Sequence, residues 1–287
     1  MFDKQRLITF AVVFAVAIAL EVGSYFVYPW VPSLKKDNPD KSAMMELRER
    51  EWASEGKKKT ITKTWVPITR ISPYMLRAVV IAEDDKFWTH EGFDFDAMEK
   101  ALEKDIKKKK LKAGGSTISQ QLAKNLYLSP SKDPVRKVKE AILTWRIERN
   151  LSKRRIIEIY LNVAEWGDGI FGIEAAARHY FHKPASALGP QEAALLASVL
   201  PNPRKYSPVS PSRYVSRRAA FIYKIMVRRG IVEPEYEDVI EHPAEPLAGA
   251  PAPSGTVIEN YSGTPPQSPE APKLEFGPGS PLTGEGK

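Results

Sequence analysis

The chain has 287 residues, of which 43% are hydrophobic, and it carries a formal net charge of +8. This length suffices for one large core or two small ones with tails, and the positive charge favours an anionic partner: lipid headgroups, phosphates or nucleic acid. The absence of cysteine excludes disulfides, a thiolate nucleophile and cysteine metal sites. His179 and His182 are three residues apart, but no third ligand stands nearby in the sequence, so a zinc site is not expected.

Residues 7–28 are almost all apolar, with Glu21 as the interruption. About 22 residues is the length that a helix needs to cross a bilayer. Because Lys4 and Arg6 precede the run, we expect residues 1–6 to stay in the cytoplasm and the remainder of the chain to be exported. A cleaved signal peptide is the alternative, since alanines 15, 17 and 19 have signal-like spacing, but the apolar run continues past them and favours an uncleaved anchor. A buried amphipathic helix is disfavoured because the run has no polar face.

The sequence beyond the anchor divides into three regions by composition. Residues 29–64 are polar and charged with little periodicity, which indicates a juxtamembrane linker with one short helix from Lys41 to Trp52. Residues 65–240 contain several amphipathic helical patterns and no alternating strand pattern, so we expect one mostly helical domain. Residues 241–287 are rich in Pro, Gly, Ser and Ala without apolar periodicity, which is typical of a disordered tail.

The expected domain is organised around the stretch from Ile71 to Gly92. Ser72 and Pro73 predict a helix start, with a capping hydroxyl followed by proline at the first helical position. One face of this helix carries, at steps of three and four, Leu76, Val79, Val80, Glu83 and Phe87. A carboxylate on such an apolar stripe needs a partner, or it has a raised pKa because it takes part in chemistry. The alternative is a helix-end glutamate whose head reaches water.

The next two segments are candidates for contact with a membrane and with an anion. Residues 92–112 predict a basic amphipathic helix that can lie among lipid headgroups, and the alternative places its apolar face on the core. That face consists of Phe95, Met98, Leu102 and Ile106. Residues 114–126, GGSTISQQLAKNL, combine two glycines with hydroxyls and a helix start whose free amides could bind an anion. Alternatively, Ser116 or Thr117 caps the helix and the two glutamines that follow are surface residues.

Asp133 and Pro134 begin another helix, on which three charged residues share one side: Arg136, Lys137 and Glu140. They could line a site, or they could form intrahelical ion pairs that contribute a few tenths of a kcal/mol each. Further helices are expected after Ser152, over 174–181, after Pro190 and over 212–229.

Four of these stretches resemble the signature motifs of the peptidoglycan glycosyltransferases, in the family's order and at compatible spacings. The motifs are EDDKFWTHEG at 83–92, GGSTISQQLAKN at 114–125, RKVKEA at 136–141 and SKRRIIEIYLN at 152–162. The run YLNVAEWGDGIFGIEAAARHYFHKPA at 160–185 resembles the monofunctional biosynthetic transglycosylases of the bacterial inner membrane. The resemblance extends from Ile71 to Met226.

This resemblance implies a mainly α, lysozyme-like, two-lobed helical domain preceded by a single transmembrane helix. It implies that lipid II is polymerised into β-1,4-linked glycan strands with release of undecaprenyl diphosphate, on the outer face of the inner membrane. Glu83 matches the general base and Glu140 the second essential carboxylate. The positions that match substrate-binding residues are Asp84, Phe87, His90, Lys112, Gly115, Ser116, Thr117, Gln121, Lys124, Arg136 and Lys137. Family members are often helped by Mg²⁺ or Mn²⁺, whose ligands are unknown here, and no organic cofactor is implied.

The residue types suit this chemistry. A sugar hydroxyl is a poor nucleophile and needs a base. A glutamate on an apolar stripe would have a raised pKa, which suits a base that works near neutral pH. Lys124, Arg136 and Lys137, with the amides that follow the two glycines, could stabilise the leaving diphosphate. Carboxylates on separate helices across a cleft are compatible with inversion at the sugar. The chain departs from the family at Lys112, where an arginine is common: lysine keeps the charge but lacks bidentate phosphate geometry.

Three other functions are alternatives to glycan polymerisation. A lytic enzyme on the same scaffold would shorten finished strands, so analysis of the products separates the two. An inactive membrane scaffold for cell-wall synthesis proteins would tolerate the loss of either glutamate. Nucleic-acid binding through the lysine runs is not expected of an exported domain. Ser129 to Lys132 spells S-x-x-K, but Pro130 lies inside it and no K-T-G follows, so a transpeptidase site is not expected.

Overall fold

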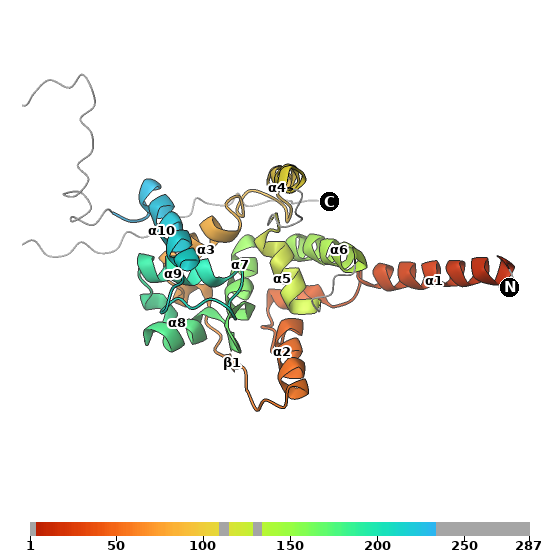
Figure 1. Cartoon of the computed structure of the whole chain (residues 1–287), viewed down its shortest axis with the longest axis horizontal. Coiled ribbons are helices and arrows are strands. Elements are labelled where there is room, and N and C mark those ends of the chain that lie inside the picture. Colours follow the sequence, from red (N-terminus) through yellow and green to blue (C-terminus); the bar gives the residue numbers. More distant parts are fainter. Residues whose placement is uncertain (1–3, 109–114, 129–133, 234–287) are drawn as a thin grey trace, which may run out of the picture. The chain divides into compact units, whose positions relative to one another are not determined.

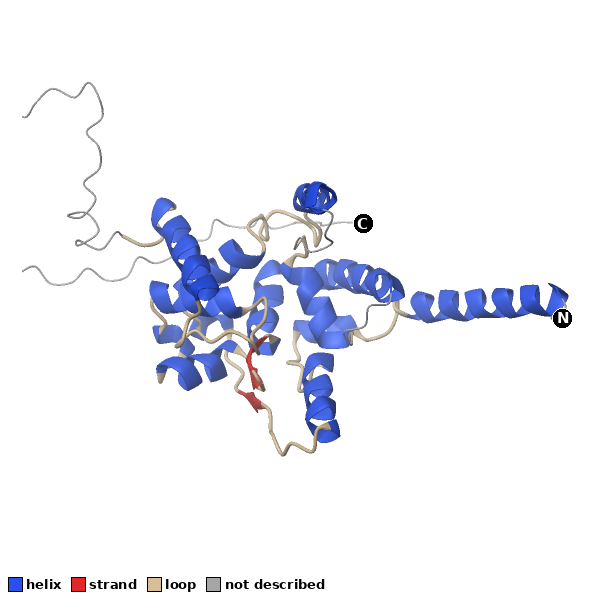
Figure 2. Ribbon diagram, in the orientation of Figure 1, coloured by secondary structure: helices blue, strands red, loops and turns tan. Residues whose placement is uncertain are grey.

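The computed structural model describes residues 4–108, 115–128 and 134–233, and within these ranges the chain is mostly helical (Figures 1 and 2). The helices are α1 (Lys4–Ser24), α2 (Ala43–Ser54), α3 (Pro73–Glu83), α4 (Phe95–Lys108), α5 (Ile118–Tyr127), α6 (Pro134–Asn150), α7 (Lys153–Val163), α8 (Ile173–Phe181), α9 (Pro190–Val199) and α10 (Arg213–Arg228). Short strands are β1 (Thr62–Lys63), β2 (Glu165–Gly167) and β3 (Ile170–Phe171). The predicted fold class, mainly α, is confirmed. Lys112, Asp133 and the predicted tail 241–287 lie outside the described residues.

The helices after α1 form two groups that meet at the middle of the domain. α9 packs against α3 and α10, whereas α5 packs against α2, α6 and α7. Helix α7 lies at the centre, because its apolar residues are buried on nearly every side, including Ile156, Ile159 and Leu161. This division agrees with the two-lobed, lysozyme-like domain that the resemblance implies, and it places α3 and α5, the helices of the first two motifs, in different groups.

Helix α1 is apolar and exposed, as predicted for a membrane anchor, but it ends earlier than predicted. It is 21 residues long, its most apolar window has a mean hydropathy of 2.3, and none of that window is buried. The prediction extended the helix to Tyr28, but the last regular turn ends at Ser24. The amides of Tyr25, Phe26 and Val27 bond to carbonyls three residues earlier, which tightens the chain into turns after the helix.

Residues 29–64, which the sequence suggests as a linker, are packed onto the domain. Ser42 caps α2 by accepting from the amide of Met45, so the predicted short helix is confirmed within two residues of its bounds. Met45 and Trp52 are 1% and 2% exposed. Strand β1 pairs in parallel with β3, which in turn pairs with β2. Two buried side chains and a strand pairing thus hold the predicted juxtamembrane linker against the domain.

Replacing Trp52 with alanine is expected to lower the free energy of unfolding by about 3–5 kcal/mol, because it empties a buried site that a large ring fills. Thermal and denaturant unfolding of the solubilised protein would measure this. The matched control is Arg50→Ala on the exposed side of the same helix, which should stay within about 0.5 kcal/mol of the parent. Equal effects of the two changes would show that α2 is peripheral to the fold.

Two local predictions at α3 need correction. The helix does begin at Pro73, but Ser72 makes no side-chain cap; its hydroxyl donates instead to the carbonyl of Leu188 at 2.7 Å. Phe87 does not extend the helical stripe, because α3 ends at Glu83 and Phe87 lies in the following turn, where it is fully buried. A tertiary hydrogen bond and tertiary packing thus replace the two local interactions that the sequence suggested.

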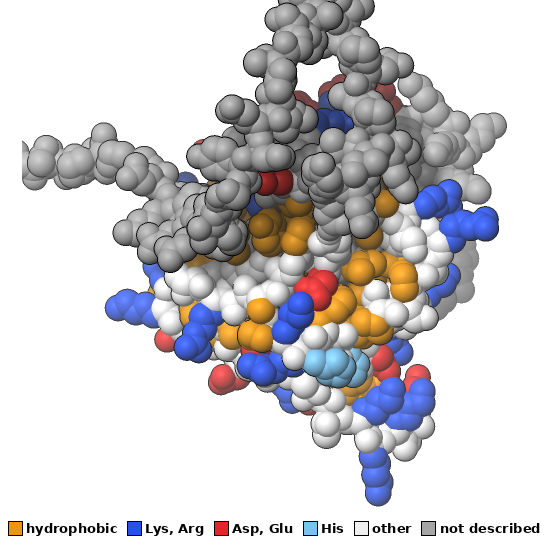
Figure 3. Space-filling model, turned by 90° about the vertical axis from the view of Figure 1, so that its left-hand side faces the viewer, with side chains coloured by type: hydrophobic (Ala, Val, Ile, Leu, Met, Phe, Trp, Pro, Cys, Tyr) orange, Lys and Arg blue, Asp and Glu red, His pale blue; other side chains and the backbone are white. Residues whose placement is uncertain are grey.

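The basic side chains of the chain are not gathered in one place on the face shown in Figure 3. On the described part of that face, Lys and Arg lie apart from one another among apolar, acidic and uncharged side chains. A continuous basic surface of the kind that follows a nucleic-acid backbone is not present there.

Candidate active site

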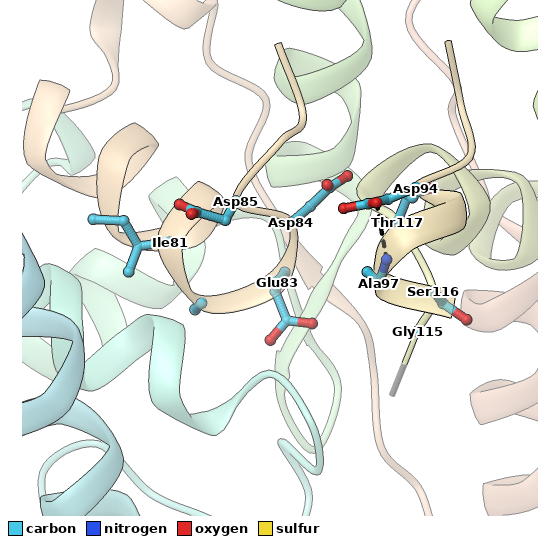
Figure 4. A pocket seen from close by; sticks show the side chains of 10 residues that line it. Ile81, Glu83, Asp84, Asp85, Asp94, Ala97, Gly115, Ser116 and Thr117 are labelled. Atoms are coloured by element: carbon cyan, nitrogen blue, oxygen red, sulfur yellow. Dashed lines mark hydrogen bonds between the residues drawn. The ribbon is translucent and has the colours of Figure 1, made fainter. Parts of the chain in front are cut away.

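Glu83, the last residue of α3, lies in a pocket between the end of α3, the first turn of α4 and the start of the second motif. The pocket is lined by Ile81, Ala82, Glu83, Asp84, Asp85, Asp94, Ala97, Gly115, Ser116 and Thr117. Figure 4 shows Glu83 directed into the space between the end of α3 and Ser116, while Asp84 and Asp85 point to opposite sides of the chain. The α3 helix ends here, so three successive side chains leave the backbone in different directions.

The Glu83 carboxylate is held by one donor on each oxygen. Gln121 Nε2 donates to Oε2 at 2.9 Å, and Arg218 Nη2 donates to Oε1 at 2.9 Å. The Glu83 side chain is 11% exposed, so the alternative of a head that reaches bulk water is wrong. Burial raises the pKa of Glu83 above its usual value, although Gln121, Arg218 and Lys124 each act to lower it. The side chain therefore has partners and a raised pKa together.

Gln121 is itself oriented by a third helix. The hydroxyl of Tyr160, on α7, donates to Gln121 Oε1 at 3.0 Å, which leaves the Gln121 amide group to donate to Glu83. Gln120 is 2% exposed and completes a capping box with Thr117. The prediction of a Thr117 cap is confirmed, and the alternative that these glutamines are surface residues is wrong.

Asp84, His90 and Thr117 join the first motif to the second. Asp84 Oδ2 accepts from the amide of Ile118 at 2.9 Å, and both Asp84 oxygens lie 2.9 Å from His90 Nε2. The amide of Gly92 donates to His90 Nδ1 at 3.0 Å, so His90 presents its Nε2 proton to Asp84. The Thr117 hydroxyl donates to the carbonyl of Gly92 at 2.7 Å. These side chains hold the pocket wall in place through contacts with protein groups.

The amides at the start of α5 are already bonded within the protein. Ile118 donates to Asp84, Gln120 donates to Thr117 Oγ1, and Thr117 donates to Gln120 Oε1. Gly115 approaches α4 closely: a Cβ there would lie 3.3 Å from the Ala101 Cβ. The glycine thus allows a helix contact, whereas the sequence suggested close approach to a ligand. Of the predicted residues here, Ser116 remains exposed at the pocket edge.

The cationic part of the site lies on α5 and α6, which pack against each other. Glu140 is 3% exposed and accepts from Arg136 Nη1 at 2.9 Å and from Lys137 Nζ. The pKa of Lys124 is lowered, chiefly by burial; Glu140 and Glu83 both raise it, whereas Arg136 and Lys137 lower it. Lys124 therefore lies close enough to Glu83 and to Glu140 for both carboxylates to act on its pKa. The predicted ion pair between Arg136 and Glu140 is confirmed as well.

Phe87 packs within the turn that follows Glu83. It is fully buried and makes edge contacts with Trp88 and His90, at ring-centroid distances of 5.0 and 6.3 Å. The Lys153 ammonium lies 4.8 Å from the centre of its ring. These contacts fit a residue that fixes the turn after Glu83.

The described acidic residues do not fit a metal site held by the protein. Among residues 4–108, 115–128 and 134–233, no group of three or more His, Asp or Glu could hold an ion. The carboxylates of the pocket are engaged elsewhere: Asp84 with His90, Asp85 with Arg229 at 2.7 Å, and Asp94 with the amide of Ala97 at 3.0 Å.

Two residues of the site, Arg218 and Tyr160, were not predicted. Arg218 lies on α10, 135 positions after Glu83, and Tyr160 lies on α7. Both occupy ordinary positions of amphipathic helices, and no local pattern separates Arg218 from the neighbouring Arg217. Their relation to Glu83 exists only after the two helical groups have packed.

The structure is thus a mostly helical domain in which a largely buried glutamate lies near several cations. Comparison with known proteins shows the family to which this domain belongs. A family model described as Transglycosylase matches residues 50–227. The chain therefore belongs to the transglycosylase family, and the resemblance noted in the four motifs is confirmed. The match begins inside the region that the sequence suggested as a linker, in agreement with the packing of α2.

The relatives narrow this class. The chain is 57% identical over 169 residues to the biosynthetic peptidoglycan transglycosylase of Azoarcus sp. (strain BH72), covering 59% of this chain and 73% of the relative. It is 47% identical over 201 residues to the protein of the same name from Dechloromonas aromatica (strain RCB), covering 70% and 84%. A third relative of that name, from Chromobacterium violaceum, is 43% identical over 222 residues, covering 75% and 97%.

Proposed function

We propose that this protein is a peptidoglycan glycosyltransferase of cell wall synthesis, which polymerises lipid II into β-1,4-linked glycan strands and releases undecaprenyl diphosphate. Membership of the transglycosylase family and the names of the relatives support this activity. The observation that links this activity to the pocket is the Glu83 carboxylate, which lines the pocket, has a pKa raised by burial and is approached by the cations Arg218 and Lys124. A base next to a cluster of cations is the arrangement that glycosyl transfer from a diphosphate needs.

In the proposed reaction, Glu83 accepts the proton of the acceptor sugar's 4-hydroxyl, which is a poor nucleophile without a base. The hydroxyl oxygen bonds to the anomeric carbon of the donor as the bond from that carbon to the diphosphate oxygen breaks. Attack from the face opposite the leaving group inverts the carbon, and Glu83 later releases its proton to water. The diphosphate leaves with the electron pair of the broken bond, so negative charge grows where Lys124, Arg136 and Lys137 can neutralise it.

A divalent cation such as Mg²⁺ or Mn²⁺ stays a proposal, and it would screen charge on the diphosphate. The described carboxylates of the pocket have protein partners: Asp84 contacts His90, Asp85 contacts Arg229, and Asp94 contacts the amide of Ala97. No organic cofactor is proposed. Other cell-wall synthesis proteins are proposed as partners on the basis of the activity alone.

We further propose that α1 anchors the chain once in the bacterial inner membrane, with the catalytic domain on its outer face. The base of α1 is tied to α6, because Arg146 donates to the carbonyls of Tyr25 and Val27 at 2.8 and 2.9 Å. On α4, Phe95 and Leu102 are 72% and 57% exposed, which contradicts packing of this apolar face on the core. Exposed apolar side chains on a basic helix support a position among lipid headgroups beside the substrate.

The test is an assay of the detergent-solubilised full chain with purified lipid II, followed by analysis of the products. Longer glycan together with free lipid diphosphate is the expected result. Shortening of finished strands without consumption of lipid II would instead identify a lytic enzyme. No turnover of either substrate by a folded protein would support an inactive scaffold.

The acid limb of the pH profile of kcat is expected above the ordinary glutamate pKa of 4.5, because burial raises the pKa of Glu83. A general base works in its deprotonated form, so activity should fall as the pH drops through this raised pKa. Initial rates at saturating lipid II would measure the limb, and thermal unfolding at each pH would separate titration from loss of fold. A limb at or below the ordinary value would argue against Glu83 as the base.

A further inference from the structure

Arg218 occupies the end of the helix that carries Glu83. Its Nη2 donates to the Ala82 carbonyl and to Glu83 Oε1, both at 2.9 Å. The last carbonyls of a helix have no partner within the helix, and a cation is favourable at that end. One guanidinium nitrogen therefore binds a carbonyl at the end of α3 and the carboxylate of the next residue. This shared donor fixes the Glu83 side chain relative to the backbone of α3.

A second arginine of the same helix region strengthens this attachment. Arg229, which follows α10, makes two hydrogen bonds to the Asp85 carboxylate, at 2.7 and 2.8 Å. Helix α10 also packs directly on α3 and α9. The chain from Ala82 to Asp85 is thus held by α10 at two points, one on each side of the turn that ends α3.

The hydrogen bonds to Glu83 leave its carboxylate able to accept a proton on either oxygen. Each carboxylate oxygen can accept two hydrogen bonds, and each is given one here, by Arg218 and by Gln121. Because Tyr160 orients Gln121, both donors are fixed by helices other than α3. One acceptor position remains on each oxygen, and the carboxylate points into the pocket (Figure 4).

The titratable groups that face Glu83 come from three packed helices, and two of them are charged. Arg218 on α10 and Lys124 on α5 favour its ionised form, whereas burial favours the neutral form. Tyr160 on α7 stays neutral, because burial raises its pKa well above 10. Of the two cations, Arg218 alone has a described hydrogen bond to the carboxylate, at 2.9 Å.

We propose that Arg218 is a positioning residue for glycosyl transfer, which holds the Glu83 carboxylate in its proton-accepting orientation. Its positive charge also favours the ionised form of that carboxylate. This inference rests on the proposed role of Glu83 as the base. It assigns to α10, which lies outside the four motifs, a direct part in preparing the active site.

The test compares Arg218→Gln, Arg218→Lys and Arg217→Gln in the full, detergent-solubilised chain with lipid II as substrate. Arg217 is the matched control, because it is the adjacent arginine and is exposed, with its Nε 3.4 Å from the Arg213 carbonyl. For Arg218→Gln we expect kcat at neutral pH to fall about tenfold, KM to stay nearly constant and the acid limb to move up by about one pH unit. For Arg218→Lys we expect the limb close to that of the parent with a reduced kcat, since lysine keeps the charge without the planar geometry. Arg217→Gln should match the parent.

The pH profile separates positioning from a structural role. If Arg218 only stabilised the fold, Arg218→Gln would lose the same fraction of activity at every pH, and the melting temperature would fall. The proposal would be overturned if the acid limb of the pH profile did not move in Arg218→Gln. It would also be overturned if the limb moved as far in Arg218→Lys as in Arg218→Gln. The parent protein and Glu83→Gln are assayed alongside: if the parent does not polymerise lipid II, or if Glu83→Gln does so normally, the proposed function fails instead.

Discussion

Replacing Glu83 with glutamine is expected to lower kcat for lipid II by a factor of about 10² to 10⁴, the usual contribution of a general base. The substitution keeps the size of the side chain, and its carbonyl can still accept one of the two hydrogen bonds that Gln121 and Arg218 donate. It removes the acceptor for the second bond and the ability to take a proton. Rates of polymer formation and of release of the lipid diphosphate would measure the loss, and KM should change little.

The control is Glu91→Gln, an exposed glutamate in the same motif, which should retain the rate of the parent. Thermal unfolding should show that Glu83→Gln is folded, because it replaces an unfavourably buried carboxylate with a neutral group. A folded Glu83→Gln protein with the rate of the parent would mean that another group removes the proton. In that case the Glu83 carboxylate would have only a structural role, which is to stabilise the end of α3.

The sequence predicted the helices well because their signals are local. Ser152 and Ser212 cap α7 and α10 by accepting from amides three residues later, and both starts could be predicted from the chain itself. Ser72 has the same local signal, but its hydroxyl bonds to a carbonyl 116 positions away. Local rules cannot separate these cases, since the competing acceptor is supplied by another part of the fold.

Residues 29–64 show a second limit of prediction from the sequence. Helix α2 combines charged residues with apolar ones that follow no clear helical periodicity, so the sequence indicated a short helix within a linker. The structure instead buries Met45 and Trp52, seven positions apart, and pairs Arg48 with Glu165 at 2.8 Å. Two large side chains and one ion pair suffice to hold a short helix, but such a sparse pattern does not differ from that of a linker.

In the site, the residue types could be predicted and their partners could not. The motifs indicated Glu83, Lys124 and Glu140; of these, Glu83 lines the pocket, and both carboxylates act on the pKa of Lys124. The hydrogen bonds that set the properties of Glu83 come from 38 and 135 positions away. The N-terminal amides of α5 illustrate the reverse case, because a pattern typical of anion binding is used here to bind the protein's own Asp84.

Glu140→Gln is expected to lower kcat/KM for lipid II by about 10² to 10³, comparable with the loss of a preorganised electrostatic group. Glu140 is buried and accepts from Arg136 and Lys137, and it lies within electrostatic reach of Lys124. Without its charge, three cations face one another with no common partner, so they should spread apart and no longer present a fixed site to the diphosphate. Steady-state kinetics at low salt would measure the loss.

The matched control for this change is Glu174→Gln on α8. Glu174 is also buried, at 4% exposure, and it pairs with an arginine four positions later, Arg178, at 2.7 Å. It also accepts from the Ala185 amide, outside the pocket, so its replacement should cost stability and leave kcat/KM nearly unchanged. Equal losses of activity in the two variants would show that the effect of Glu140→Gln is destabilisation alone.

A double variant separates the two ways in which Glu140 could act. If Glu140 serves by holding Lys137, the loss in Glu140→Gln already contains most of the loss in Lys137→Met, and the double variant should be little worse than either single one. If Glu140 instead contacts the acceptor or the donor sugar directly, the two losses should multiply. Because Lys137 Nζ donates to Glu140 Oε1 in the structure, strong non-additivity is the expected result. Multiplying losses would place Glu140 in contact with the reacting sugars and would leave Lys137 to bind the diphosphate by itself.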